Sequence, residues 1–182
     1  MKYKSNFATL AEYNLWMNES LYTAAEKLSD EIRKKDKGAF FSSIHGTFNH
    51  ILWADKAWLA RFEKNGFGSE ILAQSVRFLS TSDVADYRFE SYESFSDLKK
   101  ERSELDHTII RWIKDGLSEE KIMQNLQYKN TKGIPCVTPA YEVLTHFFNH
   151  QTHHRGQITT LLFQEGVDPG ITDLIYFLRV RA

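Results

Sequence analysis

Residues 145–157 read THFFNHQTHHRGQ, and the rest of the chain is best interpreted outward from this stretch. It holds four of the chain's seven histidines, namely His146, His150, His153 and His154. Side chains four residues apart lie on one face of an α-helix, so His150 and His154 are predicted to point at one place. Two neutral imidazoles at this spacing can bind one metal ion, but a metal site normally needs more ligands. We expect the third ligand to be His50, from the stretch NHILWAD at residues 49–55.

Helical geometry separates the histidines of this stretch from one another. The apolar stripe of the predicted helix consists of Val143, Phe147, Ile158 and Leu161. At about 100° per residue, His154 falls inside that stripe and His150 lies at its edge. His146 and His153 are turned away from the centre of the stripe. The angles therefore select His150 and His154 as the pair that faces inward.

The same treatment applies to the helix predicted around His50. Ile51, Ala54 and Trp58 lie within roughly 100° of His50, which places this histidine at the border of the core. His45 falls at roughly −140° and is expected to point to water. A lone histidine on an apolar stripe is more often a hydrogen-bonded core residue than a ligand. On spacing alone, a metal site at His50, His150 and His154 and a set of core histidines remain equal alternatives.

Length and composition set the class of protein. The 182 residues predict one globular domain, residues 1–182, with a hydrophobic content of 42%. The net charge of −1 gives no reason to expect a nucleic-acid partner or an acidic membrane surface. We find no apolar run long enough for a membrane span and no signal peptide. The lone Cys136 cannot form an internal disulfide, so we expect a cytoplasmic protein.

Apolar periodicity predicts four long helices and hence an all-α four-helix bundle. The helices are expected at about 7–28, 41–64, 94–116 and 138–165, and the second should stop at Asn65-Gly66. Residues 31–37 read as an exposed charged connection. Residues 66–94 read as a long crossover with at most a short helical turn. A small hairpin is expected from 122–128 and 134–137, and the tail after Asp168 should pack back on the bundle.

Other chemistries fit the sequence less well. A zinc protease of the HExxH type needs a glutamate as general base, but Gln151 stands at that position and an amide is a very poor proton acceptor. A ferritin-like di-iron site needs two ExxH motifs, and the chain has one, ending at His107, which we expect at the surface. Cys136 follows a proline in a predicted loop without an evident base, which argues against a catalytic thiol.

At this point the sequence resembles a known family. The chain is similar to the DinB family, within the DinB/YfiT-like superfamily of metalloenzymes. The similarity rests on YNLWMN at residues 13–18, NHILWAD at 49–55 and HQTHHRGQ at 150–157, and the tail DPGITDL at 168–174 also fits. The segment 66–94 contributes nothing to it.

The resemblance implies an up-down-down-up bundle, often a homodimer, that holds a divalent ion such as zinc or nickel. It implies His50, His150 and His154 as the metal ligands, the same set that the helical angles select. Relatives in the superfamily use the ion to activate a low-molecular-weight thiol as a small-molecule substrate. A metal-dependent thiol transferase is therefore the leading hypothesis. Asn49, His153 and Gln157 are candidates for contact with the ligands or the substrate, and a purely structural role is the alternative for each. The alternative is a non-catalytic metal-binding stress-response protein.

Overall fold

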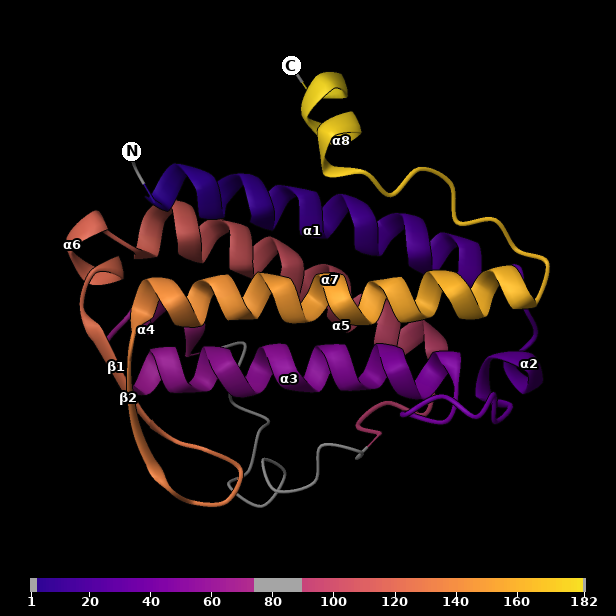
Figure 1. Ribbon diagram of the computed structural model, residues 1–182, viewed down its shortest axis with the longest axis horizontal. Helices are drawn as coiled ribbons and strands as arrows, with labels where there is room; N and C mark the ends of the chain where they lie inside the picture. The colour runs from indigo at the N-terminus through magenta and orange to yellow at the C-terminus, as the bar shows by residue number, and fades with distance from the viewer. Residues whose placement is uncertain (1–2, 74–89, 182) are drawn as a thin grey trace.

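The computed structural model describes residues 3–73 and 90–181, and most of them are helical. The four long helices are α1 (Tyr3–Ala25), α3 (Ile44–Lys64), α5 (Phe95–Arg111) and α7 (Ala140–Gln164). In Figure 1, α1 and α7 run from left to right and α3 and α5 run from right to left. α7 packs against both α1 and α3, and α5 packs against α1. The predicted all-α fold is confirmed.

Serine side chains cap the N-termini of α3 and α5. Ser43 accepts a hydrogen bond from the backbone N–H of Gly46 at the start of α3, and Ser94 accepts one from Asp97 at the start of α5. These bonds satisfy backbone donors that the first turn of a helix leaves open. At its other end α3 stops at Asn65, and Gly66 follows with a φ of 73°. The predicted stop at Asn65-Gly66 is confirmed, because a left-handed backbone favours glycine.

Several boundaries differ from the sequence-based expectation. α1 begins and ends earlier than the predicted range 7–28. The charged run contains a short helix, α2 (Asp30–Lys34), which begins where Ser29 accepts a hydrogen bond from Ile32 N. α5 continues into a π-helical turn, η1 (Trp112–Gly116). Within the predicted crossover lies α4 (Ser69–Leu72), and residues 74–89 are outside the described part of the chain.

The predicted hairpin is present, with its first strand starting later than expected. A short helix, α6 (Glu119–Ile122), occupies the start of the predicted strand because Ser118 caps it. Strands β1 (Asn125–Lys129) and β2 (Pro135–Pro139) then pair antiparallel. α7 begins at Ala140, directly after Pro139, two residues later than the predicted start at 138. The hairpin lies at the end of the bundle where α3 finishes and α7 begins (Figure 1).

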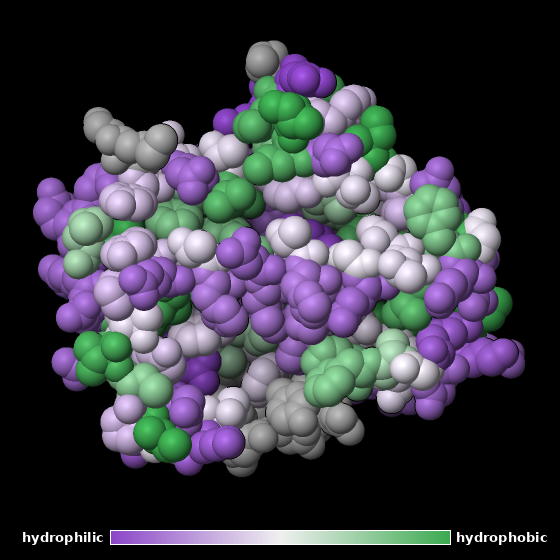
Figure 2. Space-filling view, in the orientation of Figure 1, coloured by the Kyte–Doolittle hydropathy of each residue, from purple (hydrophilic) through white to green (hydrophobic). Residues whose placement is uncertain are grey.

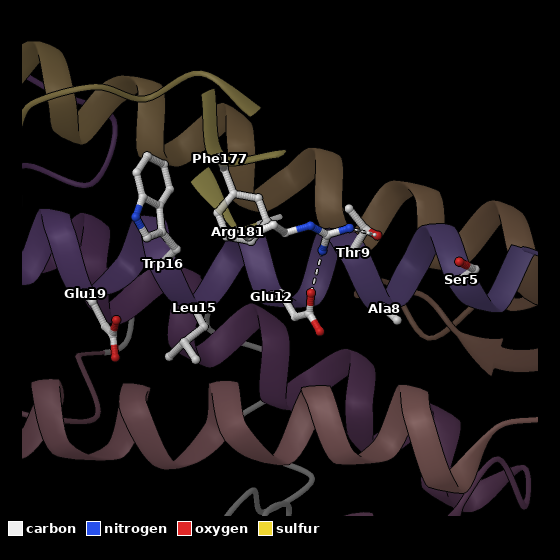
Figure 3. Close-up of a pocket in the computed structure, with 9 residues that line it drawn as sticks. All are labelled: Ser5, Ala8, Thr9, Glu12, Leu15, Trp16, Glu19, Phe177 and Arg181. Carbon is white, nitrogen blue, oxygen red and sulfur yellow. Dashed lines mark hydrogen bonds and ion pairs between the residues drawn. The ribbon is translucent and has the colours of Figure 1, made fainter. Parts of the chain in front are cut away.

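The tail returns along α1, as expected. The Tyr13 hydroxyl donates a hydrogen bond to the Thr172 carbonyl at 2.5 Å, and the Ser20 hydroxyl donates one to the Pro169 carbonyl at 2.8 Å. The last helix, α8 (Leu174–Val180), lies above α1 in Figure 1, and its Phe177 ring packs against the rings of Tyr13 and Trp16. Figure 3 shows Arg181 reaching Glu12 and Thr9 across a cavity of about 600 Å³.

Apolar side chains of all four long helices meet in one core, with Leu21, Leu52, Leu105 and Phe147 among its fully buried members. Figure 2 shows the polar outer surface along α7 and an apolar patch over α8. No helix in the described residues is both long enough and apolar enough to cross a bilayer.

Candidate metal centre

The structure brings the three predicted histidines together between α3 and α7. The Nε2 atom of His150 lies 3.3 Å from that of His50 and 3.0 Å from that of His154. One ring nitrogen from each side chain lies within 4.8 Å of the other two. His50 and His154 are each 7% exposed, and His150 is half-buried. The four-residue spacing on α7 produces the pair, and the packing of α3 on α7 supplies the third imidazole.

The spacing of these nitrogens fits a single ion. Zinc–nitrogen bonds of about 2.0–2.1 Å at tetrahedral angles place the ligand nitrogens about 3.3 Å apart. The two nearest contacts of His150 lie close to that value. Three neutral imidazoles whose ring nitrogens face one another stabilise each other little through hydrogen bonds. One cation between them would satisfy all three lone pairs. The donor set suits zinc, nickel or another borderline divalent metal.

Gln157 fixes the tautomer of His154. Its side-chain oxygen, Oε1, lies 2.8 Å from His154 Nδ1, so Nδ1 carries the proton and donates it to the amide. His154 Nε2 is then left with a lone pair that points toward His150 Nε2. A metal-binding histidine normally donates its other ring N–H in this way. Gln157 therefore orients His154, as its place near the predicted site suggested.

Burial favours the neutral forms of His150 and His154. The Phe41 ring stacks on His50 at 3.7 Å and meets His154 edge-on at 5.4 Å. Burial, and after it the charges that His154 and His50 would carry, together lower the pKa of His150 to about 3. Burial also lowers the pKa of His154. At neutral pH His150 and His154 thus present unprotonated nitrogens, which metal binding requires.

The predicted orientation of His45 needs correction. His45 was expected to point to water, but it is fully buried and its Nε2 lies 2.7 Å from the Tyr92 carbonyl. The helical angle was right about α3 alone but could not show that the segment before α5 covers this face. Asn49 is also buried, and it exchanges hydrogen bonds with the backbone of Tyr92. Its contacts anchor that segment to α3.

The remaining histidines follow the helical angles. His146 and His153 are exposed on α7, and His107 is exposed on α5. His153 Nε2 lies 3.5 Å from the Gln157 amide nitrogen, on the outer side of the site. His146 lies one turn before His150, with a ring-to-ring distance of 5.8 Å.

Sequence reasoning missed a buried charged network beside the neighbouring face of α7. Arg102 Nη1 lies 2.6 Å from Asp55 Oδ2, and its Nη2 lies 2.7 Å from Asp106 Oδ1. Asn14 and Asn18 each donate a hydrogen bond to Asp106 at 2.8 Å. The i, i+4 spacing of Arg102 and Asp106 was a readable signal, but such pairs are also common on solvated helix faces.

α7 contributes Gln151 and Arg155 to this network. Arg155 donates hydrogen bonds to the side-chain oxygens of Asn14 and Gln151. Gln151 is fully buried. The residue at the position of a zinc protease's general base is thus engaged with the network, one residue away from the His150 face of the helix.

Comparison with known sequences agrees with this arrangement. The sequence model of the DinB family matches residues 1–181. The chain belongs to the DinB family. It is 29% identical over 175 residues to Protein DinB of Bacillus subtilis (strain 168), covering 96% of this chain and 95% of that protein.

The DinB-like segments named above have two structural roles. NHILWAD supplies His50 to the histidine cluster and Asp55 to the charged network. HQTHHRGQ supplies His150 and His154 to the cluster and Arg155 to the network. Family membership together with this cluster indicates metal binding.

Proposed function

We propose that this protein is a divalent-metal enzyme that activates a low-molecular-weight thiol, with His50, His150 and His154 as the metal ligands. The convergence of three ring nitrogens at spacings of 3.0 and 3.3 Å carries the proposal. The described Cys, Asp and Glu residues form no further group with these three, so the proposed protein ligands number three. Catalytic zinc sites commonly have three protein ligands and one exchangeable position.

The surroundings favour a thiol over a water molecule as the nucleophile. Hydrolysis by a metal-bound water benefits from a nearby general base. Gln151, at the position where such a base would be sought, cannot accept a proton readily, and its oxygen accepts a hydrogen bond from Arg155. A divalent ion held by the three histidines would itself favour the deprotonated form of a thiol. The chain then needs to supply only orientation and exclusion of water, which Phe41 and the buried imidazoles provide.

The experiment uses cobalt-substituted protein with glutathione, bacillithiol or cysteine, and a chlorinated aromatic as electrophile. The thiolate sulfur forms a bond to the aromatic carbon, the carbon–chlorine bond breaks, chloride leaves with the electron pair and the thiol proton passes to solvent. We expect conjugation to be faster than with metal-free protein and to be lost in His154→Ala. We also expect the thiol to change the cobalt absorption spectrum.

A second function is favoured by the low exposure of the ligands. His50 and His154 are each only 7% exposed, so access to an ion between them is narrow. An ion that only ties α3 to α7 would make this a non-catalytic metal-binding stress-response protein. A cobalt spectrum that no thiol changes would support this alternative and overturn the thiol proposal.

We also propose a homodimer that works in the cytoplasm. Ile175 and Val180 of α8 are each 55% exposed, and Ile171, which lies before α8, is 47% exposed, so apolar side chains are exposed on and next to this helix (Figure 2). Cys136 is a free thiol, in keeping with a reducing compartment. Sedimentation should give twice the chain mass for the wild type and a monomer for Ile175→Lys/Val180→Lys. A monomeric wild type at micromolar concentration would contradict the dimer.

A further inference from the structure

A second cavity, of about 420 Å³, lies between the C-terminal half of α3 and the β1–β2 hairpin. Three cationic side chains line it, namely Arg61, Lys64 and Lys129. Within residues 3–73 and 90–181, none of the three forms an ion pair with a carboxylate. The other lining residues are neutral, so the cavity concentrates positive charge in a protein whose net charge is −1.

The walls of this cavity are held in place by backbone contacts. Asn65 Nδ2 donates hydrogen bonds to the carbonyls of Arg61 and Gln127, each at 2.8 Å, and its Oδ1 accepts one from Gln127 N at 3.0 Å. One side chain thus joins the last turn of α3 to strand β1. In the hairpin turn, Asn130 Oδ1 accepts from the backbone N–H groups of Lys132 and Ile134. The hairpin therefore has a fixed position on α3.

Arg61 is positioned as an anion receptor. Its guanidinium lies 4.5 Å from the centre of the Trp58 ring and 5.7 Å from that of Tyr128. The two rings contact the face of the planar guanidinium. The N–H donors of the guanidinium lie along its edge. Burial lowers the pKa of Arg61, so part of its hydration is already lost. A guanidinium in this state gains from a ligand carboxylate, which it can bind through two parallel hydrogen bonds.

The cavity lies on the same face of α3 as the histidine cluster. Ala57 and Arg61 follow His50 by seven and eleven residues, which places both within roughly 20° of it around the helix. Eleven residues correspond to about 17 Å of helix. The guanidinium of Arg61 packs over Trp58, about one turn nearer to His50. The distance along the helix between this guanidinium and His50 is therefore about 11 Å.

Aromatic rings connect the two sites. Trp58 lies 5.3 Å from His146, and His146 lies 5.8 Å from His150. On the other side, Trp58 lies 5.2 Å from Tyr128 of the hairpin. His146, which has no metal-binding role in the proposed site, thereby lies between the two sites. A ligand that follows this row would contact His146 and Trp58 between its two ends.

We propose that this cavity binds the carboxylate end of the thiol substrate, with Arg61, Lys64 and Lys129 as its receptors and the sulfur directed to the histidine cluster. The inference rests on the proposed thiol function and makes it more specific. The shorter spacing of about 11 Å suits a peptide-like thiol: two extended residues between the sulfur and the carboxylate cover about 7 Å, and the metal–sulfur bond and the hydrogen bond to Arg61 make up the remainder. Small uncharged thiols would reach the cluster without using this cavity.

Isothermal titration of the metal-loaded protein at low salt tests the inference with two ligands. S-methylglutathione retains the carboxylates but its sulfur carries no removable proton, and its diethyl ester has neither carboxylate charge. We expect wild-type protein to bind the acid at least about tenfold more tightly than the ester, a difference of about 1.4 kcal/mol. Arg61→Gln should remove this preference. Binding of acid and ester with equal affinity, or failure of the acid to bind, would overturn the inference.

Matched variants separate charge from folding. Lys132→Gln removes the same charge from the hairpin turn, outside the cavity lining, and should change the acid's affinity by less than about twofold. Arg61 also covers two aromatic rings, so circular dichroism and metal content must match wild type. The double variant Lys64→Gln/Lys129→Gln alters only exposed side chains and should still weaken the acid several-fold. Equal weakening of acid and ester in these variants would contradict the assignment.

The cobalt spectrum distinguishes this inference from the proposed function. If glutathione changes the spectrum with the same midpoint in wild type and Arg61→Gln, the cavity assignment fails and the thiol function stands. If glutathione leaves the spectrum unchanged while S-methylglutathione still requires Arg61, the thiol function fails and the cavity remains a carboxylate site of another ligand. A spectral midpoint that rises about tenfold in Arg61→Gln supports both.

Discussion

Two neighbouring faces of α7 carry polar residues at the same spacing, but one face contributes to the histidine cluster and the other to the charged network. His150 and His154 turn toward α3 and meet His50. Gln151 and Arg155, one position further along, turn toward α1 and the charged network. Both pairs are four residues apart, so the difference lies in what each face meets.

The charged network is balanced by its own members. Two guanidiniums, Arg102 and Arg155, share the bundle interior with two carboxylates, Asp55 and Asp106. The histidine cluster brings together three bases of the same kind, and no described cysteine or carboxylate joins them as a possible ligand. Buried charged groups that pair with one another indicate a structural role. Three histidines that converge without pairing indicate a site for a bound metal ion. The two faces should therefore respond differently to substitution.

The largest effect is expected from breaking the network. Arg102→Ala would leave two buried carboxylates without their cation, which should lower the free energy of unfolding of metal-free protein by about 3–5 kcal/mol. Urea denaturation measures this loss. As a control, Lys99→Gln removes an exposed partner of Glu26 and should cost less than about 1 kcal/mol. Similar losses in the two variants would show that the network is not what stabilises the bundle.

Breaking the histidine cluster should instead remove the metal and leave the fold. At a free metal concentration of one hundred times Kd, binding adds about 2.7 kcal/mol to stability. His150→Ala should lose this increment and its ion while metal-free stability stays near wild type. Elemental analysis should give about one ion per chain for wild type and for His107→Ala, an exposed site on α5. Full occupancy in the His150 variant would refute the ligand assignment. His45→Ala is unsuitable as a control because His45 is buried.

A finer test removes the hydrogen bond that orients His154 and leaves the three ligands unchanged. Gln157→Ala removes the acceptor at His154 Nδ1 and should weaken metal binding about 10–100-fold, measured by competition with a chelator. Gln157→Glu keeps an oxygen acceptor and should bind metal nearly as well as wild type. If both variants weaken binding equally, the hydrogen bond to His154 does not account for the effect.

The pH dependence of metal-free protein tests His150 alone. In metal-free protein the pKa of His150 is about 3, whereas in the unfolded chain it is about 6.5. The unfolded state therefore takes up this proton first, and stability present above pH 6.5 declines as pH falls toward 3. One such group contributes at most about 1.4 kcal/mol per pH unit. Denaturation between pH 7 and 4 should show a shallower decline in His150→Ala than in wild type. Parallel curves would mean that His150 is not held neutral by burial.

The comparison also shows how far the sequence could be interpreted. The helical period predicts the four long helices and identifies the inward-facing histidines, since both depend on local geometry alone. The third histidine, His50, followed from its position at the edge of another stripe. The same method failed for His45, because a segment distant in sequence covers it and contributes the Tyr92 carbonyl.

The network could not be inferred because its members come from four helices and look ordinary in isolation. In the sequence, Asn14 and Asn18 look like polar residues of one amphipathic helix. Arg102 looks like part of the charged face of another helix. Only the packing of α1 against α5 shows that their polar atoms meet inside the bundle. The cavity at Arg61 was equally hidden, since it requires the hairpin that Asn65 attaches to α3.

The tail that follows α7 has a different consequence, for how this sequence can vary. Tyr13 and Ser20 hold it through the carbonyl groups of Thr172 and Pro169, which every amino acid possesses. Substitution of either tail residue leaves the acceptor in place, whereas deletion of one residue shifts both acceptors along α1. Natural variants should therefore exchange the side chains at 169 and 172 more freely than they change the length of chain between α7 and α8.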